Sequence, residues 1–355
     1  LVMGGCAEAP PPRIGIVVSA MPGQAAKLAA AEERLDRPGY FEPDIPPSSV
    51  ELSEAEQAIE QAYAFVRDPR ILAVIGHASS PASLAASQIY NSAGLVQIAP
   101  TTTAPVYGQA GPFSFRLVPS DTAQAAYLLM ARRHHWPAAS RLAVVHVNDD
   151  YGRGLIRSLR PMLDGVAFEG MYGDAADRAA IALLHQGITA SKADLLIWLG
   201  RPSALGLLLP LLRADLPDMA VICSDACDTH VVYSNDDGRF TGLSFVRFTN
   251  PNTADSAVRA FQARYLEHTG EVASSEALLT YDAVSLVRAA LRDGADTREE
   301  VRRYLASLGG DRPAFQGLTG PIKFDASGTC SRSYMLAEVR ADSVASAAHT
   351  RHYGM

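Results

Sequence analysis

Residues 71–99, ILAVIGHASSPASLAASQIYNSAGLVQIA, decide the fold class of this chain. An apolar strand is expected at 71–76, a helix with a proline in its first turn at 81–92, and a second apolar strand at 95–99. Both strands are apolar along their whole length, which is typical of strands that are covered on both faces. The segment therefore predicts a parallel sheet with helices on both sides, an α/β fold.

The same alternation of strand and helix continues on both sides of this segment. Before it, a strand at 13–19 and a helix at 24–35 are followed by a Pro-rich connection and a helix at 54–67. After it come a short strand at 113–117 and a helix at 120–135. The pattern then restarts, with strands at 142–146, 166–171, 194–199 and 220–223 and helices at 151–163, 177–191 and 202–214. Two further helices, at 256–268 and 278–292, and late strands at 321–325 and 335–340 predict that a return segment completes the first unit.

Composition limits the classes of function. The chain has 355 residues, enough for about two domains of roughly 150 residues each. Its 31 Lys and Arg against 38 Asp and Glu give a net charge of −7, which argues against a nucleic-acid backbone as the main partner. The uncharged stretch 71–115 is broken by polar residues and contains no apolar span of ~20 residues. Motifs for a P-loop, a zincin or a serine-hydrolase elbow are missing from the sequence.

The four cysteines have different expectations. Leu1 to Cys6 resembles a bacterial lipoprotein processing box, so residues 1–12 are interpreted as a signal remnant and tether lipidated at Cys6; the alternative is an incidental thiol. Cys223, Cys227 and Cys330 allow one disulfide at most. Cys223, Cys227 and His230 could also supply zinc ligands, but their spacing matches no standard structural site and a fourth ligand is not evident, so no metal is predicted.

Short polar residues follow two neighbouring strands of the predicted sheet. The segment 76–81 carries Ser79 and Ser80 and leads into a helix, where free backbone N–H groups and the helix dipole favour an anion such as a carboxylate. The segment 100–105, which contains three threonines, follows the next strand. Ligands of open α/β sheets bind at this carboxyl edge. The pattern favours a small zwitterion or polar ligand; the alternative is that these residues only cap the helix and form a turn.

Seven short motifs are spread over the chain: VIGHxxS at 74–80, QIYN at 88–91, AGL at 93–95, QIAPTTT at 97–103, FRLVPSD at 115–121, DYGxG at 150–154 and YDA at 281–283. Together they resemble the type I periplasmic binding proteins of the leucine/isoleucine/valine-binding family, the solute receptors of ABC importers. The resemblance covers Ile14 to about Asp325. It implies two Rossmann-like lobes that are joined by three crossings and close on a ligand by a hinge motion. Lobe 1 is then expected to comprise 13–121 and 251–325, lobe 2 to comprise 122–250 and 326–345, and 346–355 to be a tail.

The resemblance also implies roles in ligand binding for individual residues. Ser80 would bind the ligand carboxylate through its hydroxyl and N–H. Thr101 would offer its carbonyl to the α-ammonium group, and Thr103 its hydroxyl and N–H. Tyr151 would cover the ligand when the lobes close. Asp225 would be the acidic partner of the ammonium group.

Three further residues carry alternatives. Asp228 is a rival to Asp225, because the match to the family is loose there. Tyr281 is expected either to line the cleft or to pack inside a lobe. Arg201 stands where branched-chain amino-acid receptors carry an aromatic residue, so it is expected either to bind a second anionic group of the ligand or to point to solvent.

The predicted function is that of a non-catalytic, extracytoplasmic receptor, monomeric and without a cofactor. It would capture a small amino-acid-like ligand and present it to the membrane permease of an ABC importer. Two alternatives remain open from the sequence. One is a sensor of the same fold that reports an amide or amino acid to a regulatory partner. The other is an α/β enzyme that would use Asp225 or His77 as acid and base, with the cysteines as metal ligands.

Overall fold

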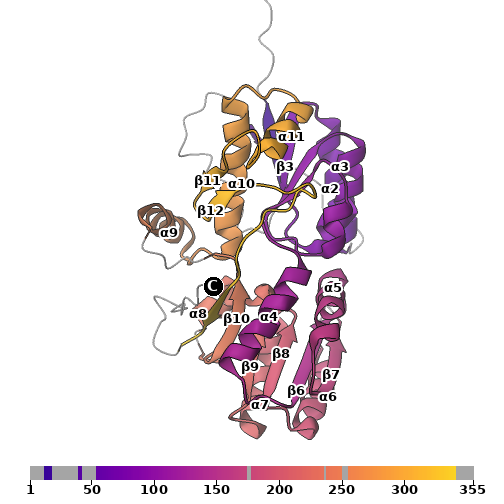
Figure 1. The fold of residues 1–355 in the computed structure, drawn as a ribbon, viewed down its shortest axis with the longest axis vertical. Coiled ribbons are helices and arrows are strands. Elements are labelled where there is room, and N and C mark those ends of the chain that lie inside the picture. Colours follow the sequence, from indigo (N-terminus) through magenta and orange to yellow (C-terminus); the bar gives the residue numbers. More distant parts are fainter. Residues whose placement is uncertain are drawn as a thin grey trace, which may run out of the picture.

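The computed structural model describes residues 12–17, 39–41, 53–173, 177–235, 237–249 and 255–340. In this part of the chain two α/β lobes, each built on its own sheet, lie above one another (Figure 1). The expected α/β class with mainly parallel sheets is therefore confirmed. The expected helix at 24–35, Cys6 and the tail 346–355 lie outside the described residues. None of the described helices is long and apolar enough to cross a membrane.

The first sheet has the strand order β2-β1-β3-β4-β5 among the described residues, and all neighbouring strands are parallel. Buried β3 carries no charged side chain, which allows both of its faces to be covered. The strand order of the sheet places the ends of β3 and β4 side by side, as the sequence predicts. The strands are β1 (Arg13–Val17), β2 (Gly39–Phe41), β3 (Ile71–Gly76), β4 (Val96–Ala99) and β5 (Ser114–Arg116).

Helices cover both faces of this sheet. On one face, α2 (Glu54–Arg67) and α3 (Ser80–Ser92) pack together, and Phe65 and Tyr90 are fully buried there. On the other face, α10 (Ser275–Arg292) and α11 (Arg298–Ser307) contact β3. Helix α9 (Ser256–Thr269) packs on α10, and the hairpin of β11 (Phe315–Gly317) and β12 (Gly320–Ile322) contacts α10 as well.

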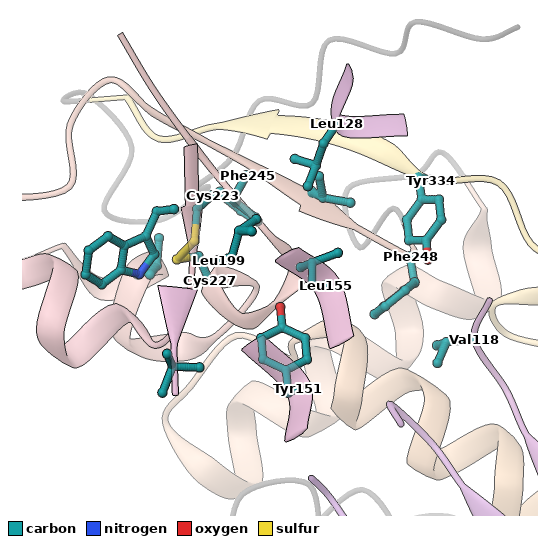
Figure 2. Packing of buried hydrophobic residues seen from close by; sticks show 14 of the residues in the cluster. Val118, Leu128, Tyr151, Leu155, Leu199, Cys223, Cys227, Phe245, Phe248 and Tyr334 are labelled. Carbon is teal, nitrogen blue, oxygen red and sulfur yellow. A yellow bond between two sulfur atoms is a disulfide. The ribbon is translucent and has the colours of Figure 1, made fainter. Parts of the chain in front are cut away.

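The second sheet has the order β13-β10-β9-β8-β6-β7 in the described part of the chain, and β13 is antiparallel to β10 whereas the other pairs are parallel. Its strands are β6 (Leu142–Val147), β7 (Val166–Tyr172), β8 (Leu195–Leu199), β9 (Ala220–Cys223), β10 (Leu243–Arg247) and β13 (Met335–Glu338). The accompanying helices are α4 (Asp121–His135), α5 (Asp150–Leu159), α6 (Arg178–Ser191), α7 (Pro202–Asp215) and α8 (His230–Ser234). Figure 2 shows part of the buried core of this lobe.

The chain passes between the lobes after β5, after β10 and before β13 (Figure 1). The third passage differs from the predicted boundary at residue 326. Arg116 donates its N–H to Gly328 O and accepts the N–H of Cys330, at 2.9 and 3.0 Å. These bonds extend the first sheet beyond β5, so the chain is still attached to the first lobe at Cys330.

Several regular elements were not anticipated from the sequence, among them strands β2, β10 and β11 and helices α8 and α11. Helix α11 begins with a capping box, in which Thr297 and Glu300 exchange hydrogen bonds with each other's backbone N–H groups. This Thr-x-x-Glu signal is visible in the sequence. Helix α10 begins at Ser275, three residues before the predicted start, and this displacement affects the candidate site.

Candidate functional site

A cavity of about 210 Å³ lies between the lobes, at the carboxyl ends of strands from both sheets. Side chains that follow β3, β4, β8 and β9 meet there, as expected for a ligand site in parallel α/β sheets. Its volume suits a small metabolite, because it lies below the range of drug-sized pockets. The lining residues are Ala78, Ser79, Ser80, Thr101, Tyr151, Arg201, Pro202, Asp225, Ala226, Asp228, Thr229, Phe248, Ser275 and Glu276.

A larger depression of about 900 Å³ lies elsewhere, on the surface of the first lobe. Its lining comes from one continuous region, residues 290–313, which contains the end of α10 and all of α11. Hinge closure could not enclose a ligand there, because the second lobe supplies none of these residues. The smaller cavity between the lobes is therefore the candidate site.

Four helices of at least 10 residues begin at this cavity in the described part of the chain. Ser79 is the N-cap of α3 and Asp149 is the N-cap of α5, and each side chain accepts a backbone N–H of its own first turn. Arg201 precedes α7, where no side chain caps the helix, and Ser274 caps α10. The positive ends of helix dipoles and the free N–H groups of first turns favour an anionic group in such a place.

Three expected residues of the first lobe line the cavity. Ser80 is 4% exposed, and its Oγ accepts the N–H of Ala104 at 3.3 Å. Thr101 Oγ1 donates to Ala78 O at 3.0 Å, which fixes the turn after β4 against the turn after β3. Ser79 donates its hydroxyl to Glu54 at 2.6 Å. Ser79 is therefore occupied by helix capping and by Glu54, whereas the Ser80 hydroxyl proton has no acceptor among the described residues.

Thr103 and Tyr281 do not line the cavity. Thr103 is fully buried, and its carbonyl accepts the Asp121 N–H at 2.8 Å and an Arg116 N–H at 3.2 Å. Tyr281 packs edge-on against Phe261, with 4.9 Å between the ring centroids. The structure therefore places Thr103 beneath the site and Tyr281 inside the first lobe, the second of the two positions considered for it.

Tyr151 and Asp225 meet in the second lobe. The Tyr151 hydroxyl lies 2.7 Å from Asp225 Oδ1 and 2.7 Å from Ser224 Oγ. Gln124 binds Asp225 twice, through its Nε2 to Oδ1 at 2.6 Å and through its Oε1, which accepts the Asp225 N–H at 3.2 Å. Asp225 is thus held by polar groups that carry no positive charge. Neither of its two side-chain partners, Tyr151 and Gln124, is a cation that could balance the charge of the carboxylate.

Burial raises the pKa of Asp225 to about 6, and the bonds from Tyr151 and Gln124 oppose that rise. The carboxyl is therefore mostly ionised at neutral pH and held in a poorly hydrated place, where a cation gains most from pairing with it. A disulfide between Cys223 and Cys227 closes the loop that carries Asp225 (Figure 2). Both sulfur atoms are covalently paired, so they are not available as thiolate ligands for zinc.

Asp228, the rival of Asp225, already has a cation. Its Oδ1 accepts from Arg247 Nη2 at 3.1 Å and from the Tyr233 hydroxyl. Arg247 is fully buried and Asp228 is 5% exposed. This internal ion pair makes Asp225 the better candidate for binding a cationic group of a ligand.

Arg201 lines the cavity and is paired with Asp149, with 2.9 Å between Nη2 and Oδ2. Its guanidinium carbon lies 5.6 Å from the centre of the Tyr151 ring, a cation–π distance. Arg201 therefore does not point away into solvent. Its charge is balanced by Asp149, so its position gives little support to a second anionic group on the ligand.

The residues at or next to the cavity that the sequence analysis missed include Gln124, Phe248, Ser275 and Glu276. Gln124 is 101 positions from Asp225, and nothing local in the sequence marks their contact. Ser275 and Glu276 were missed because the helix was expected to begin at 278. The signal that could have located them is the N-cap Ser274, whose side chain accepts the Ala277 N–H.

The described residues include no group of three or more His, Cys, Asp or Glu side chains arranged to hold a metal ion. The site consists instead of hydroxyl groups and helix starts near a buried carboxyl group. Such an arrangement can bind a small molecule that carries both an anionic and a cationic group.

Comparisons with known proteins agree with this geometry. A family model described as "Periplasmic binding protein" matches residues 53–344. The chain is 26% identical over 289 residues to "Leu/Ile/Val-binding protein homolog 1" of Brucella abortus, a match that covers 78% of this chain and 74% of the relative.

Solved structures share the fold. A leucine binding protein from Thermotoga maritima superposes with a TM-score of 0.81 at 19% identity, covering 93% of this chain and 96% of that one. A solute binding protein of an ABC transporter from Rhodopseudomonas palustris, in complex with 3,4-dihydroxy benzoic acid, gives a TM-score of 0.76 at 15% identity, with 93% of each chain covered. These likenesses confirm the expected two-lobed, Venus-flytrap fold. The match of the family model over most of the sequence shows that this chain belongs to the periplasmic binding protein family.

Proposed function

We propose that this protein is an extracytoplasmic solute receptor of an ABC importer and captures a small amino acid between its lobes. The observation that carries the proposal is the cavity itself, which joins hydroxyl groups and helix starts to a buried carboxyl group, Asp225. Family membership supports a binding role, and relatives of the chain are named as Leu/Ile/Val-binding proteins. No bond is broken in this function, and the membrane permease is the partner of the closed form.

The ligand is oriented by two sets of groups, one that binds its carboxylate and one that binds its ammonium group. Its carboxylate lies at the start of α3, where the Ser80 hydroxyl and backbone N–H groups donate to it. Its α-ammonium group lies against Asp225 in the second lobe, with the Thr101 carbonyl as a further acceptor. Tyr151 covers the ligand from the second lobe.

Closure follows from this division of the contacts. Ser80 and Thr101 belong to the first lobe, whereas Tyr151 and Asp225 belong to the second. A ligand can touch both sets only when the lobes are shut, so it binds the closed form more tightly and shifts the population toward it. Isothermal titration with a panel of free amino acids tests the proposal, and failure to bind any of them would contradict it.

Replacing Ser80 with Ala is expected to weaken amino-acid binding about 10- to 150-fold, because a hydrogen bond to a charged group is lost. Titration calorimetry measures the change. Ser92→Ala is the matched control, since Ser92 is an exposed serine at the other end of the same helix and is expected to leave the affinity unchanged. Equal affinities for the wild type and Ser80→Ala would contradict the placement of the carboxylate.

The disulfide is expected to hold Asp225 in place. A double variant, Cys223→Ala with Cys227→Ala, should lose about 2 kcal/mol of unfolding free energy, because the unfolded chain is no longer cross-linked. It should also bind amino acids more weakly, because the loop with Asp225 becomes freer. Urea unfolding and titration measure the two effects. Cys330→Ala, which removes a buried free cysteine, is the control for binding. An unchanged affinity in the double variant would show that the short helical turn Asp225–Cys227 positions Asp225 without the disulfide.

We also propose that the protein is monomeric and is anchored by a lipid on Cys6. The lipoprotein-like sequence ending at Cys6 supports the anchor. Mass spectrometry of the native N-terminal peptide tests the lipid, and light scattering of the protein with and without amino acid tests the monomer. An unmodified Cys6 or a stable dimer would contradict the respective proposal.

A further inference from the structure

Glu276 is a second carboxyl group at the cavity, and within the described ranges one of its oxygen atoms has no hydrogen-bond partner. It lies in the first turn of α10 and lines the cavity from the first lobe. Its Oε1 is buried and has no hydrogen-bond partner among the described residues. Burial raises the pKa of Glu276 to about 7. Because an unpaired buried carboxyl costs stability, its presence at a binding cavity calls for an explanation.

The charges around the cavity show which groups still need a partner. Two of the four charged residues in the lining are paired within the protein: Arg201 with Asp149, and Asp228 with Arg247. Asp225 is the third, and the proposed function assigns it to the α-ammonium group of the ligand. Glu276 is the fourth, and neither an ion pair among the described residues nor the proposed function assigns it a partner.

Burial raises the pKa of Glu276, and no cationic side chain in the described part of the chain lowers it. Its neighbours include Tyr265 on α9 and a second acid, Glu271. The pKa of Tyr265 is raised mainly by burial and further by the negative charges of Glu276 and Glu271. A phenol and a second acid cannot balance a carboxylate. A positive charge on the ligand can balance it.

We propose, on the basis of the proposed function, that Glu276 selects ligands with a second cationic group. The cavity would then bind amino acids with an amine or guanidine side chain more tightly than aliphatic amino acids. An aliphatic side chain would displace water from Glu276 and give it no hydrogen bond in return, whereas an ammonium or guanidinium group would pair with it. Arg201 does not favour an acidic side chain instead, because Asp149 already neutralises it.

Matched pairs of ligands isolate the effect of the charge. Lysine differs from norleucine, and ornithine from norvaline, by one terminal amine. At pH 7.5 the wild type should bind lysine or ornithine at least tenfold more tightly than the uncharged match in titration calorimetry. Glu276→Gln should abolish this preference and keep norleucine affinity within about threefold. Glu271→Gln is the control, because it removes a nearby charge from outside the cavity lining and should leave the preference intact.

Proton release gives a second measurement. Pairing with a cation lowers the pKa of Glu276, so lysine binding at pH 7 should release part of a proton from this carboxyl. The release appears as a binding enthalpy that differs between phosphate and Tris buffers. Asp225 also releases protons on binding. The contribution of Glu276 is therefore measured as the difference in proton release between the wild type and Glu276→Gln. Norleucine, which has no side-chain amine, should show no such difference.

The outcomes separate this inference from the proposed function. If norleucine binds as tightly as lysine, and Ser80→Ala still weakens both, then the receptor function stands and the assignment of Glu276 is overturned. If Glu276→Gln weakens lysine and norleucine by the same factor, the assignment is overturned as well. If no amino acid binds the wild type, both proposals fail. A lysine preference that depends on Glu276 supports both.

Discussion

Asp225→Asn is expected to weaken amino-acid binding by a factor on the order of 30 to 5,000, the cost of removing one partner from a buried charge pair. The same substitution should make the ligand-free protein more stable at neutral pH. The reason is that burial raises the pKa of Asp225 from its ordinary value of 3.8 to about 6, so the folded protein carries an ionised carboxyl in an unfavourable place. The variant therefore separates a binding role from a structural one.

The sign of the stability effect depends on pH. A carboxyl whose pKa is higher in the folded chain than in the unfolded chain lowers the unfolding free energy as pH rises through the interval between the two values. For Asp225 this interval runs from 3.8 to about 6, so the cost is complete above it and absent below it. Two units correspond to about 3 kcal/mol, which is the upper limit of the gain for Asp225→Asn at pH 7.

Urea unfolding of the wild type and Asp225→Asn at pH 7.5 and at pH 4 measures this difference, and a titration at pH 7.5 measures binding. We expect the variant to be more stable at pH 7.5 and the two proteins to converge at pH 4. Binding by the wild type should also weaken as pH falls below about 6, because protonated Asp225 no longer attracts the ammonium group. A variant that binds normally, or that is less stable at pH 7.5, would contradict the role of Asp225.

Arg247→Met is expected to lower the unfolding free energy by about 3–5 kcal/mol, the largest stability effect predicted here. Arg247 is fully buried, and its Nη2 lies 3.1 Å from Asp228 Oδ1. The substitution keeps an apolar stem of similar length but leaves the Asp228 carboxylate buried without a cation, bound only by uncharged hydroxyl groups such as that of Tyr233. The loss should shrink at low pH, where Asp228 can accept a proton.

The double variant Arg247→Met with Asp228→Asn should recover most of the lost stability, because no unpaired charge remains. Arg160→Met is the matched control. Arg160 and Glu169 form an ion pair at the surface, with the Arg160 side chain 59% exposed, so its loss should cost less than about 1 kcal/mol. Urea unfolding of the wild type and the three variants measures these differences in unfolding free energy. A small effect of Arg247→Met would show that water or local rearrangement solvates Asp228 in the folded state.

The pair of Asp228 and Arg247 also explains why two nearby acids on one loop have different uses. Asp225 and Asp228 are three positions apart, and each follows the same strand, β9. One is paired with a buried arginine of β10, and the other is held by the uncharged partners Tyr151 and Gln124. The sequence favoured Asp225 through the family resemblance and kept Asp228 as a rival. It could not show that Asp228 is already paired with an arginine, because β10 itself was not recognised as a strand.

Local patterns were sufficient for the fold class and the family. Apolar runs, proline in first turns and Gly- or Pro-rich ends mark strands and helices wherever they occur in the chain, and a parallel sheet brings the ends of β3 and β4 to one edge. The convergence of Ser80 and Thr101 follows from this rule alone. Thr103 shows its limit, since a residue can follow the right strand and still turn inward, where Arg116 and Asp121 bind its carbonyl.

By itself the sequence determined the alternating α/β architecture, the family and the two hydroxyl-bearing turns, because each depends on neighbours only a few positions apart. Only the tertiary structure decided which charges are already satisfied: Arg201 is paired with Asp149 and Asp228 with Arg247, whereas Glu276 has no ion-pair partner among the residues that the structure describes. The physical reason is that the free energy of a buried charge depends on what lies within a few ångströms in space. Those partners come from other strands and helices, at distances along the chain that no local pattern records.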